Sequence, residues 1–536
     1  SLHERVFFRP LLAAVSTLSR DEVVLTESAA QDRLAALGYR DPRGAMRHIQ
    51  ALTSGVSRRA EIQRHLMPVL LGWFADGVDA DAGLLGFRIV SESLGTTSWY
   101  LRMLRDSPAA AERLCHILSS SRYITDLLED APTSITWLDK VADLQPLGAA
   151  ALKAEIASLL SRHDDSAEAM RAVRYLRRRE ILRIAMGDAL NLLGVQQVCT
   201  GLATVDECTI GAALALAERE EITAKEREEA AGIREIPEEE PKNPLLTEIA
   251  VIAMGRLGGA ENGFGSDADV MFVHRPVEGA GEDEAQPQAN RIVNRLMQLI
   301  KQPVRPAIRA ERPLEVDADL RPEGKQGAMV RSLDSYRAYY ERWAETWEFQ
   351  ALLRARPIAG SEELGRAFIE LIDPYRYPRE FTAEQAQQVR RMKARVEHER
   401  MPHGADRTRQ LKLGRGGLSD VEWLVQLIQL QHAHEVEGLR TTSTLEALNA
   451  AVEANLMAAE DAEVLRDAWL LATKIRGGNV LRGVRQSDLL PTLRDALEAV
   501  ARWSGYTPGN ARQLEEDYLR VTRNARKVYE RLFFEG

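Results

Sequence analysis

Apolar residues recur at helical spacing along most of the chain. From about residue 2 to residue 219, nearly every window carries apolar side chains three or four positions apart, as at Leu152 and Ile156. Asp, Ser or Pro separate these windows, as is typical of helix ends. The helical period returns after Ser332 and holds to the end of the chain. The pattern therefore predicts a long helical region on each side of a central segment.

The period changes in that central segment. Residues 249–254 and 270–273 are short apolar runs rich in β-branched side chains and bounded by Gly or Pro, which is typical of strands in a covered sheet. A helix is expected at about 289–301, and the three prolines after it favour an extended connection. Residues 314–320 and 328–330 are predicted to form a third and a fourth strand.

These elements predict a predominantly helical α+β protein with three parts. We expect a helical region over 1–245, a mixed α/β unit over 246–357 and a helical bundle over 358–536. The segment 218–244 is charged and carries prolines, which indicates a linker or an exposed helix that ends in a loop. A chain of 536 residues is long enough to bury more than one core.

Charge and composition exclude several classes of function. The 70 basic and 80 acidic side chains give a net charge of -10, which argues against general nucleic-acid binding. The apolar runs fall short of the ~20 residues that cross a bilayer, and no secretory segment is recognised. We therefore expect a cytoplasmic protein with no membrane or nucleic-acid partner. The start at Ser1 without Met suggests a piece cut from a longer protein.

Cysteine usage gives no support for a metal or redox centre. Cys115, Cys199 and Cys208 form no C-x-x-C pair and have no histidine at zinc-ligand spacing. We predict that all three are buried thiols.

The candidate chemistry lies in residues 255–273, G-R-L-G-G-A-E-N-G-F-G-S-D-A-D-V-M-F-V. On a strand, Asp267 and Asp269 would project from the same face with Cα atoms ~6.6 Å apart, which suits Mg²⁺. Gly258, Gly259 and Ser266 would offer backbone N–H groups and a hydroxyl to phosphate oxygens.

A third carboxylate is expected from residues 315–321, where charged and mainly apolar residues alternate as on a strand with one exposed face. Both Asp317 and Asp319 lie on that face. Either would complete a site for two metal ions beside Asp267 and Asp269. Arg321 could pair with a triphosphate or neutralise Asp319.

The order of these features carries more weight than any single motif. Acids at i and i+2 should occur roughly a dozen times by chance in so acidic a chain, so D-x-D by itself predicts little. The order of strand, Gly-Gly, Gly/Ser loop, D-A-D strand and separate V-D strand favours metal-dependent chemistry. Residues 263–268 match G-x-G-x-x-A but are followed by a strand, whereas a dinucleotide fingerprint opens a helix. The sequence contains neither a phosphate loop ending in G-K-[ST] nor a G-x-S-x-G elbow.

Two further groups have open interpretations. Lys412 and Arg415, followed by two glycines and a helix that Ser419 or Asp420 could cap, could bind phosphate or could be solvated residues at a helix cap. The second group comprises Trp343, Trp347 and Phe349. We predict that these three are core anchors rather than platforms for base stacking.

The motifs resemble a known family. L-G-G, seven residues and D-A-D-V resemble the signature of DNA polymerase β-type nucleotidyltransferases. Five longer motifs are similar to those of bacterial glutamine synthetase adenylyltransferase. They are M-G-R-L-G-G-A-E, G-S-D-A-D-V-M-F-V, V-D-A-D-L-R-P-E-G, W-E-F-Q-A-L-L-R-A-R-P and K-L-G-R-G-G-L-S-D-V-E-W. This resemblance runs in motifs from about residue 249 to residue 434.

The resemblance implies roles for individual residues. Asp267 and Asp269 would be metal ligands and catalytic residues, and Asp317 would be the third carboxylate, with Asp319 as its rival. Gly258, Gly259 and Ser266 would hold the nucleotide phosphates, and Arg321 and Lys412 are further nucleotide-binding candidates. Asn262 departs from the family pattern, because an apolar residue is more usual there.

The resemblance also implies an activity. Family members are two-headed: an N-terminal half removes AMP from a tyrosine of glutamine synthetase and a C-terminal half attaches it. This chain looks more like the attaching half, which would use ATP and two Mg²⁺ ions, release pyrophosphate and down-regulate nitrogen assimilation. The PII signal protein and glutamine would be regulators. The alternatives are the reverse, phosphorolytic activity and a catalytically idle module that senses PII protein and glutamine.

Overall fold

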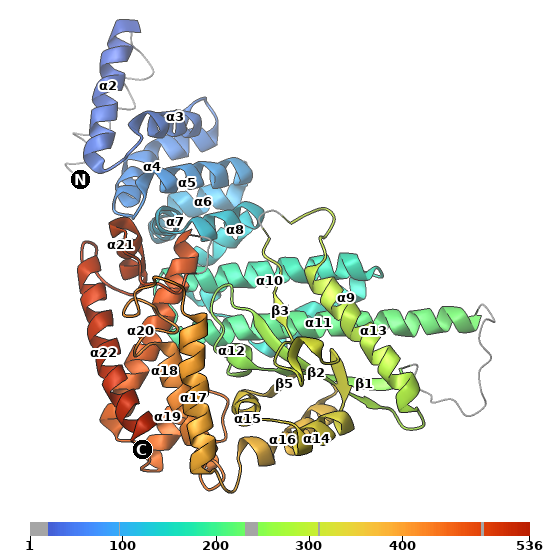
Figure 1. The fold of residues 1–536 in the computed structure, drawn as a ribbon. Coiled ribbons are helices and arrows are strands. Elements are labelled where there is room, and N and C mark those ends of the chain that lie inside the picture. The colour runs from blue at the N-terminus through green and yellow to red at the C-terminus, as the bar shows by residue number, and fades with distance from the viewer. Residues whose placement is uncertain (1–19, 96, 231–244, 309–310, 484–486, 536) are drawn as a thin grey trace.

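The computed structural model describes residues 20–95, 97–230, 245–308, 311–483 and 487–535. Helices dominate both ends of the chain, and a small mixed sheet lies between them (Figure 1). The predicted fold class, a predominantly helical α+β protein, is confirmed. The predicted helical start near residue 2 lies outside the described residues.

The N-terminal region is a stack of helices. Several begin at a side-chain cap; for example, Ser57 accepts a hydrogen bond from the Ala60 N–H and Asp79 accepts one from the Ala82 N–H. Their apolar faces pack through fully buried side chains such as Phe74 and Phe87. The elements are α2 (Arg20–Leu37), α3 (Pro42–Thr53), α4 (Arg58–Ala75), α5 (Ala80–Leu94), α6 (Ser98–Asp106), α7 (Pro108–Ser120), α8 (Arg122–Asp130), η2 (Pro132–Leu138), η3 (Val141–Leu144), α9 (Ala149–Arg162), α10 (Ser166–Ala189) and α11 (Val195–Ala230).

Helix α11 joins this region to the sheet. It packs against α10, α13 and β5, and it continues through the first part of the segment expected to be a linker. Residues 231–244 of that segment lie outside the described residues. By length and composition, Val195–Arg227 is apolar enough to cross a membrane, which the sequence analysis did not recognise. However, 72% of the apolar 18-residue stretch of this helix is buried inside the protein, as in the core helix of a folded domain.

The sheet has five strands in the order β3-β2-β1-β5, with β4 also paired to β2. Strand β1 runs antiparallel to β2 and β5, whereas β3 and β4 run parallel to β2. The strands are β1 (Thr247–Ala253), β2 (Ala268–Pro276), β3 (Val316–Asp317), β4 (Val330–Ser332) and β5 (Arg356–Gly360). Between them lie α12 (Gly255–Gly258), α13 (Glu282–Lys301) and η4 (Gly324–Gln326).

One predicted strand was too long and one strand was missed. Strand β3 is much shorter than the predicted 314–320, because the chain turns after Asp317, whose carboxylate accepts the Asp319 N–H at 2.7 Å. Strand β5 was not predicted at all. It is a short edge strand that contains Pro357, and such a sequence carries a weak strand pattern. Because β5 pairs with β1, the sheet extends past the expected limit at residue 357.

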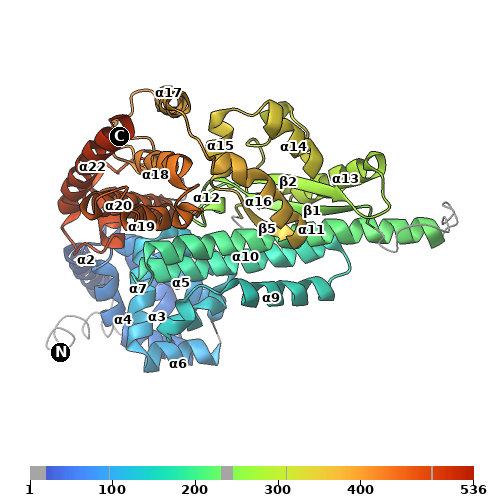
Figure 2. The ribbon, with the colours of Figure 1, turned by 90° about the horizontal axis from the view of Figure 1, so that it is seen from below.

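Alternate residues of β1 and β2 fill two different cores. Val251 and Phe272 pack with Ile292 of α13 on the face toward α11. Ile252 and Met271 belong to a second cluster that includes residues of α14 (Leu333–Arg342) and α16 (Glu362–Arg376). Figure 2 shows α10 and α11 on one side of the sheet and α14 and α16 on the other. Helices therefore cover both faces, which explains the nearly continuous apolar character of these two strands.

The C-terminal helices form a separate bundle with its own core, which includes the fully buried Trp469. The remaining elements are α15 (Thr346–Leu352), α17 (Ala383–Arg400), α18 (Leu418–His432), η5 (Glu437–Leu439), α19 (Thr444–Glu453), α20 (Ala459–Gly483), α21 (Arg494–Trp503) and α22 (Ala511–Phe534). Helices α18, α20, α21 and α22 pack on one another, with α17 alongside α18. The bundle thus adjoins the sheet unit through α15 and α17.

Predictions for aromatic and cysteine side chains had mixed outcomes. Trp343 is 73% exposed, so its predicted role as a core anchor was wrong. Trp347 and Phe349 are only partly buried, because α15 lies at the edge of a cavity. The three cysteines are buried free thiols, which confirms the prediction for them.

Candidate functional site

Strand β2 presents two carboxylates at its start. Asp269 lies within the strand and Asp267 directly before it, and neither is buried, whereas the neighbouring Ala268 and Val270 are. The strand period therefore directs both carboxylates away from the core. They emerge where the loop from β1 enters β2.

The structure distinguishes Asp317 from Asp319. Asp317 lies on β3 directly opposite Asp269 in the parallel register, so these two residues are neighbours across the sheet. Asp319 has left the strand, and its carboxylate pairs with Arg321 at 3.6 Å and Lys325 at 3.3 Å. Asp317, and not Asp319, therefore joins Asp267 and Asp269 in one cluster.

The three carboxylates are close enough to repel one another. Burial raises the pKa of Asp269 to about 6, with a further contribution from the charge of Asp317, while Lys412 opposes the shift. The pKa of Asp267 is also raised, first by burial and then by the charges of Glu315 and Asp317. The cluster therefore holds an excess of negative charge that a bound cation would relieve.

The donor set fits Mg²⁺ bound together with a phosphate ligand. In the described part of the chain, no three His, Cys, Asp or Glu side chains converge closely enough to hold an ion by themselves. Mg²⁺ is usually held by one or two carboxylates, with waters and substrate phosphates completing its shell. Asp267, Asp269 and Asp317 could serve in this way.

A glycine that the sequence analysis missed keeps this space open. Gly255 begins α12 with φ +52°, and a Cβ there would lie 2.2 Å from Oδ2 of Asp269. No other residue type could occupy this position without displacing that carboxylate. Its role depends on a contact across the sheet, so spacing in the sequence gives no indication of it.

Replacing Gly255 tests this arrangement. We expect Gly255→Ala to lower the transfer activity that the family resemblance implies by about tenfold or more, because the new methyl group displaces the Asp269 carboxylate. The matched control is Gly265→Ala, in which the backbone also has a positive φ, +71°, but the new Cβ meets nothing within 4 Å. Equal losses in the two variants would show that backbone strain, and not the contact with Asp269, is responsible. Steady-state transfer rates decide between these outcomes.

The paired glycines expected to hold phosphate have packing contacts instead. The N–H groups of Gly258 and Gly259 donate to the carbonyls of Met254 and Gly255. A Cβ on Gly258 would lie 1.8 Å from the Arg354 carbonyl oxygen, and one on Gly259 would lie 2.5 Å from the Arg354 guanidinium. Glycine is required here by the close approach of the chain before β5. These contacts weigh against the predicted phosphate role.

The loop that carries the carboxylates is fastened to helices on both sides. Asn262 is fully buried and donates to Asp206 of α11 at 2.9 Å, which gives a physical reason for its departure from the family pattern. The buried Glu261 pairs with Arg354 at 3.1 Å and accepts the Thr444 N–H, at the start of α19, at 2.6 Å. The sequence analysis gave neither residue a positioning role, because their partners lie far away in the chain.

Ser266 and Arg321 also serve the local fold. The Ser266 hydroxyl accepts the Gly263 N–H at 2.9 Å and so closes the loop before Asp267. Arg321 is buried and donates to three carbonyls, those of Gly327, Ala318 and Lys325. Its predicted contact with a triphosphate is therefore not supported, because its donors hold the turn after β3.

Lys412 reaches the site from the C-terminal part of the chain. It is exposed, and its charge acts on both Asp267 and Asp269. The glycine loop after it is packed in the bundle, since the Gly416 N–H donates to Asp420 and a Cβ on Gly416 would lie 1.9 Å from the Thr522 carbonyl oxygen. Gly417 is the N-cap of α18 and no side chain caps this helix, so neither Ser419 nor Asp420 has the expected capping role. Lys412 is left as an exposed cation beside the carboxylates.

A cavity of about 930 Å³ adjoins Lys412 between the sheet unit and the C-terminal helices. Lys412 and Arg400 supply cations and also act on Asp269, whereas Trp347 and Trp423 supply aromatic surface. The other lining residues, which include three acids, are Leu320, Gln350, Ala351, Met392, Arg395, Val396, Glu399, Pro402, Gln410, Leu413, Ser419, Glu422, Gln426, Ser487, Asp488 and Leu489. Such a mixture of apolar walls and convergent cations suits a nucleotide.

Comparisons with known proteins agree with these features. Residues 111–371 match the glutamate-ammonia ligase adenylyltransferase family, and residues 390–533 match the GlnD PII-uridylyltransferase family. Proteins named bifunctional glutamine synthetase adenylyltransferase/adenylyl-removing enzyme align with nearly the whole chain. The one from Streptomyces avermitilis is 49% identical, over 99% of this chain and 53% of its own length.

Two further relatives carry the same name. The protein from Leifsonia xyli subsp. xyli is 48% identical, over 99% of this chain and 51% of its own length. The protein from Mycobacterium tuberculosis is 44% identical, over 99% of this chain and 52% of its own length. The chain therefore spans about half the length of the curated relatives it matches.

Proposed function

Because the chain belongs to the glutamine synthetase adenylyltransferase/adenylyl-removing family over nearly its whole length, we propose that it transfers AMP from ATP to a tyrosine hydroxyl of glutamine synthetase. The observation that carries this proposal is that Asp267, Asp269 and Asp317 lie at adjacent strands, within electrostatic reach of Lys412 and Arg400, which line the 930 Å³ cavity. Nucleotidyl transfer needs such a combination of carboxylates for metal and cations for phosphate.

The chain's own residues account for binding and orientation. Lys412 and Arg400 attract the triphosphate, and the apolar and aromatic walls of the 930 Å³ cavity accept the base. In the reaction, the phenol oxygen forms a bond to the α-phosphorus while the bond to pyrophosphate breaks. The phenol proton passes to the Asp317 carboxylate, whereas the Asp319 carboxylate is paired with Arg321 and Lys325.

Asp267 and Asp269 would hold Mg²⁺, which when bound neutralises phosphate charge and polarises the phosphorus–oxygen bonds, and Asp317 would serve as the base or as a ligand to a second ion. The position of Gly255 leaves the Asp269 carboxylate free to take part. Glutamine synthetase is the proposed protein substrate, and PII protein and glutamine are proposed regulators, with a cytoplasmic location. The match of residues 390–533 to a PII-uridylyltransferase supports a link to PII signalling.

The reverse activity, phosphorolysis of adenylyl-tyrosine, remains the second candidate because the same carboxylate cluster would serve it. The experiment incubates the chain with labelled ATP, Mg²⁺ and glutamine synthetase, and separately with phosphate and the adenylylated protein. Label on glutamine synthetase supports the proposal, and release of ADP in the second arm supports the alternative. No turnover in either arm would favour the idle regulatory module. A nucleic-acid primer should gain no nucleotide, given the net charge of -10.

A further inference from the structure

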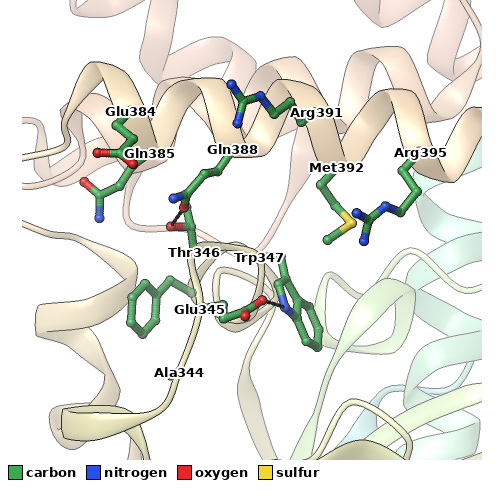
Figure 3. Close-up of a pocket in the computed structure, with 11 residues that line it drawn as sticks. Ala344, Glu345, Thr346, Trp347, Glu384, Gln385, Gln388, Arg391, Met392 and Arg395 are labelled. Carbon is green, nitrogen blue, oxygen red and sulfur yellow. Dashed lines mark hydrogen bonds between the residues drawn. The ribbon is translucent and has the colours of Figure 1, made fainter.

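A groove lies between α15 and α17, apart from the carboxylate cluster. Its volume is about 580 Å³. Figure 3 shows side chains of α17 reaching toward the start of α15 across this space. We call it the α15–α17 groove; its lining residues are Ala344, Glu345, Thr346, Trp347, Phe349, Glu384, Gln385, Gln388, Arg391, Met392 and Arg395.

The α15–α17 groove is continuous with the large cavity beside the carboxylates. Trp347, Met392 and Arg395 line both spaces. Figure 3 shows Met392 and Arg395 on the same side of α17, above Trp347. A ligand in the groove would therefore meet a nucleotide bound in the cavity.

The groove carries two exposed cations, Arg391 and Arg395. Within the part of the chain that the structure describes, neither forms an ion pair or a side-chain hydrogen bond. Two acids face the groove. Glu345 is engaged, because it accepts the Trp347 indole N–H at 2.9 Å and caps α15, whereas Glu384 lies in the first turn of α17. Arg391 within the groove and Arg395, which also lines the cavity, are thus available to an acidic ligand.

Aromatic surface surrounds the same groove. Trp347 is partly buried along its wall, and Trp343, one residue before Ala344, is 73% exposed. Exposed Trp beside Met and Arg is the composition found at the centre of protein–protein interfaces. The groove therefore suits a polypeptide better than a small anion.

We propose that the α15–α17 groove binds the segment of the protein substrate that carries the target tyrosine. Arg391 and Arg395 pair with acidic side chains near that tyrosine, and Trp347 and Met392 pack against an apolar neighbour. The occupant follows from the continuity of the two spaces: a folded protein substrate must reach the nucleotide from the surface, and this groove leads there. The inference rests on the proposed function.

The test reverses one charge that lies in the groove but does not line the nucleotide cavity. We expect Arg391→Glu to raise the KM for glutamine synthetase by about tenfold or more, with the KM for ATP unchanged within about twofold. Arg391→Lys, which retains the charge, should recover most of the affinity. The matched control is Arg523→Glu on α22, an exposed arginine outside the groove. Affinity for glutamine synthetase, measured by sedimentation without ATP, should follow the same order.

The outcomes separate the two proposals. If the wild-type chain transfers no AMP to glutamine synthetase, the proposed function fails. If it transfers AMP and Arg391→Glu keeps the wild-type KM and affinity for glutamine synthetase, the groove is not the docking site. An equal loss in Arg523→Glu would show that the effect is one of overall charge and would also overturn the inference. Circular dichroism and thermal melting of each variant identify a folding defect. If Arg391→Glu has such a defect, Arg391→Ala takes its place and is judged by the same changes in KM and affinity for glutamine synthetase.

Discussion

Asp317→Asn should lose most AMP transfer, by a factor of the order of 10², whereas Asp319→Asn should lose less than about tenfold. Asp317 lies beside Asp269 in the parallel register of β3 and β2, so removing its charge removes the proposed proton acceptor from the cluster. Asp319 points into a turn, where Arg321 and Lys325 already neutralise it. The sequence placed both residues on one strand and could not choose between them by spacing.

The two variants should differ in turnover and not in nucleotide binding. Asp267 and Asp269 remain in both, together with Lys412, so ATP affinity in the presence of Mg²⁺ should change little. The comparison needs transfer rates at saturating substrate and a separate binding titration with ATP. A severe loss in Asp319→Asn with a mild loss in Asp317→Asn would reverse the assignment. A large loss of ATP affinity in Asp317→Asn would instead make it chiefly a metal ligand.

The sequence predicted the elements whose pattern is local. The apolar runs at 249–254 and 270–273 correspond to β1 and β2, because both faces of these strands are covered and the runs are therefore nearly continuous. The spacing of Asp267 and Asp269 indicated a shared face, since strand geometry has a period of two. Both inferences depend on residues within one strand.

The sequence could not predict features that arise from distant contacts. Gly258 and Gly259 pack against Arg354, and Asn262 bonds to Asp206, so neither role is visible in the loop itself. Strand β5 is defined by its pairing with β1. It contains Pro357, and a proline within so short a run argues against a strand when only the sequence is read. For the same reason, the sequence around Gly255 does not show that this residue faces Asp269.

The largest expected effect on stability comes from Asp420, which joins three helices of the C-terminal bundle. Its carboxylate is 1% exposed and accepts hydrogen bonds from Lys393 of α17 at 2.8 Å, Arg526 of α22 at 2.9 Å and the Gly416 N–H at 2.7 Å. The Lys393 side chain is itself only 2% exposed. The structure therefore assigns Asp420 a central position in a buried charge network, beyond the helix-cap role expected from its position after Gly417.

We expect Asp420→Ala to lower the free energy of unfolding of the bundle by about 3 kcal/mol, because the buried Lys393 then keeps only the partly exposed Glu397 as a carboxylate partner. The matched control is Asp461→Ala, which removes an ion pair to Arg531 whose side chain is 52% exposed; such a pair contributes about 0–1 kcal/mol. Urea titration followed by amide hydrogen exchange over α17, α18 and α22 separates the bundle from the rest of this large chain. Similar losses of protection in the two variants would contradict this expectation. They would show that the buried Asp420 network contributes no more to the stability of the bundle than an exposed ion pair does.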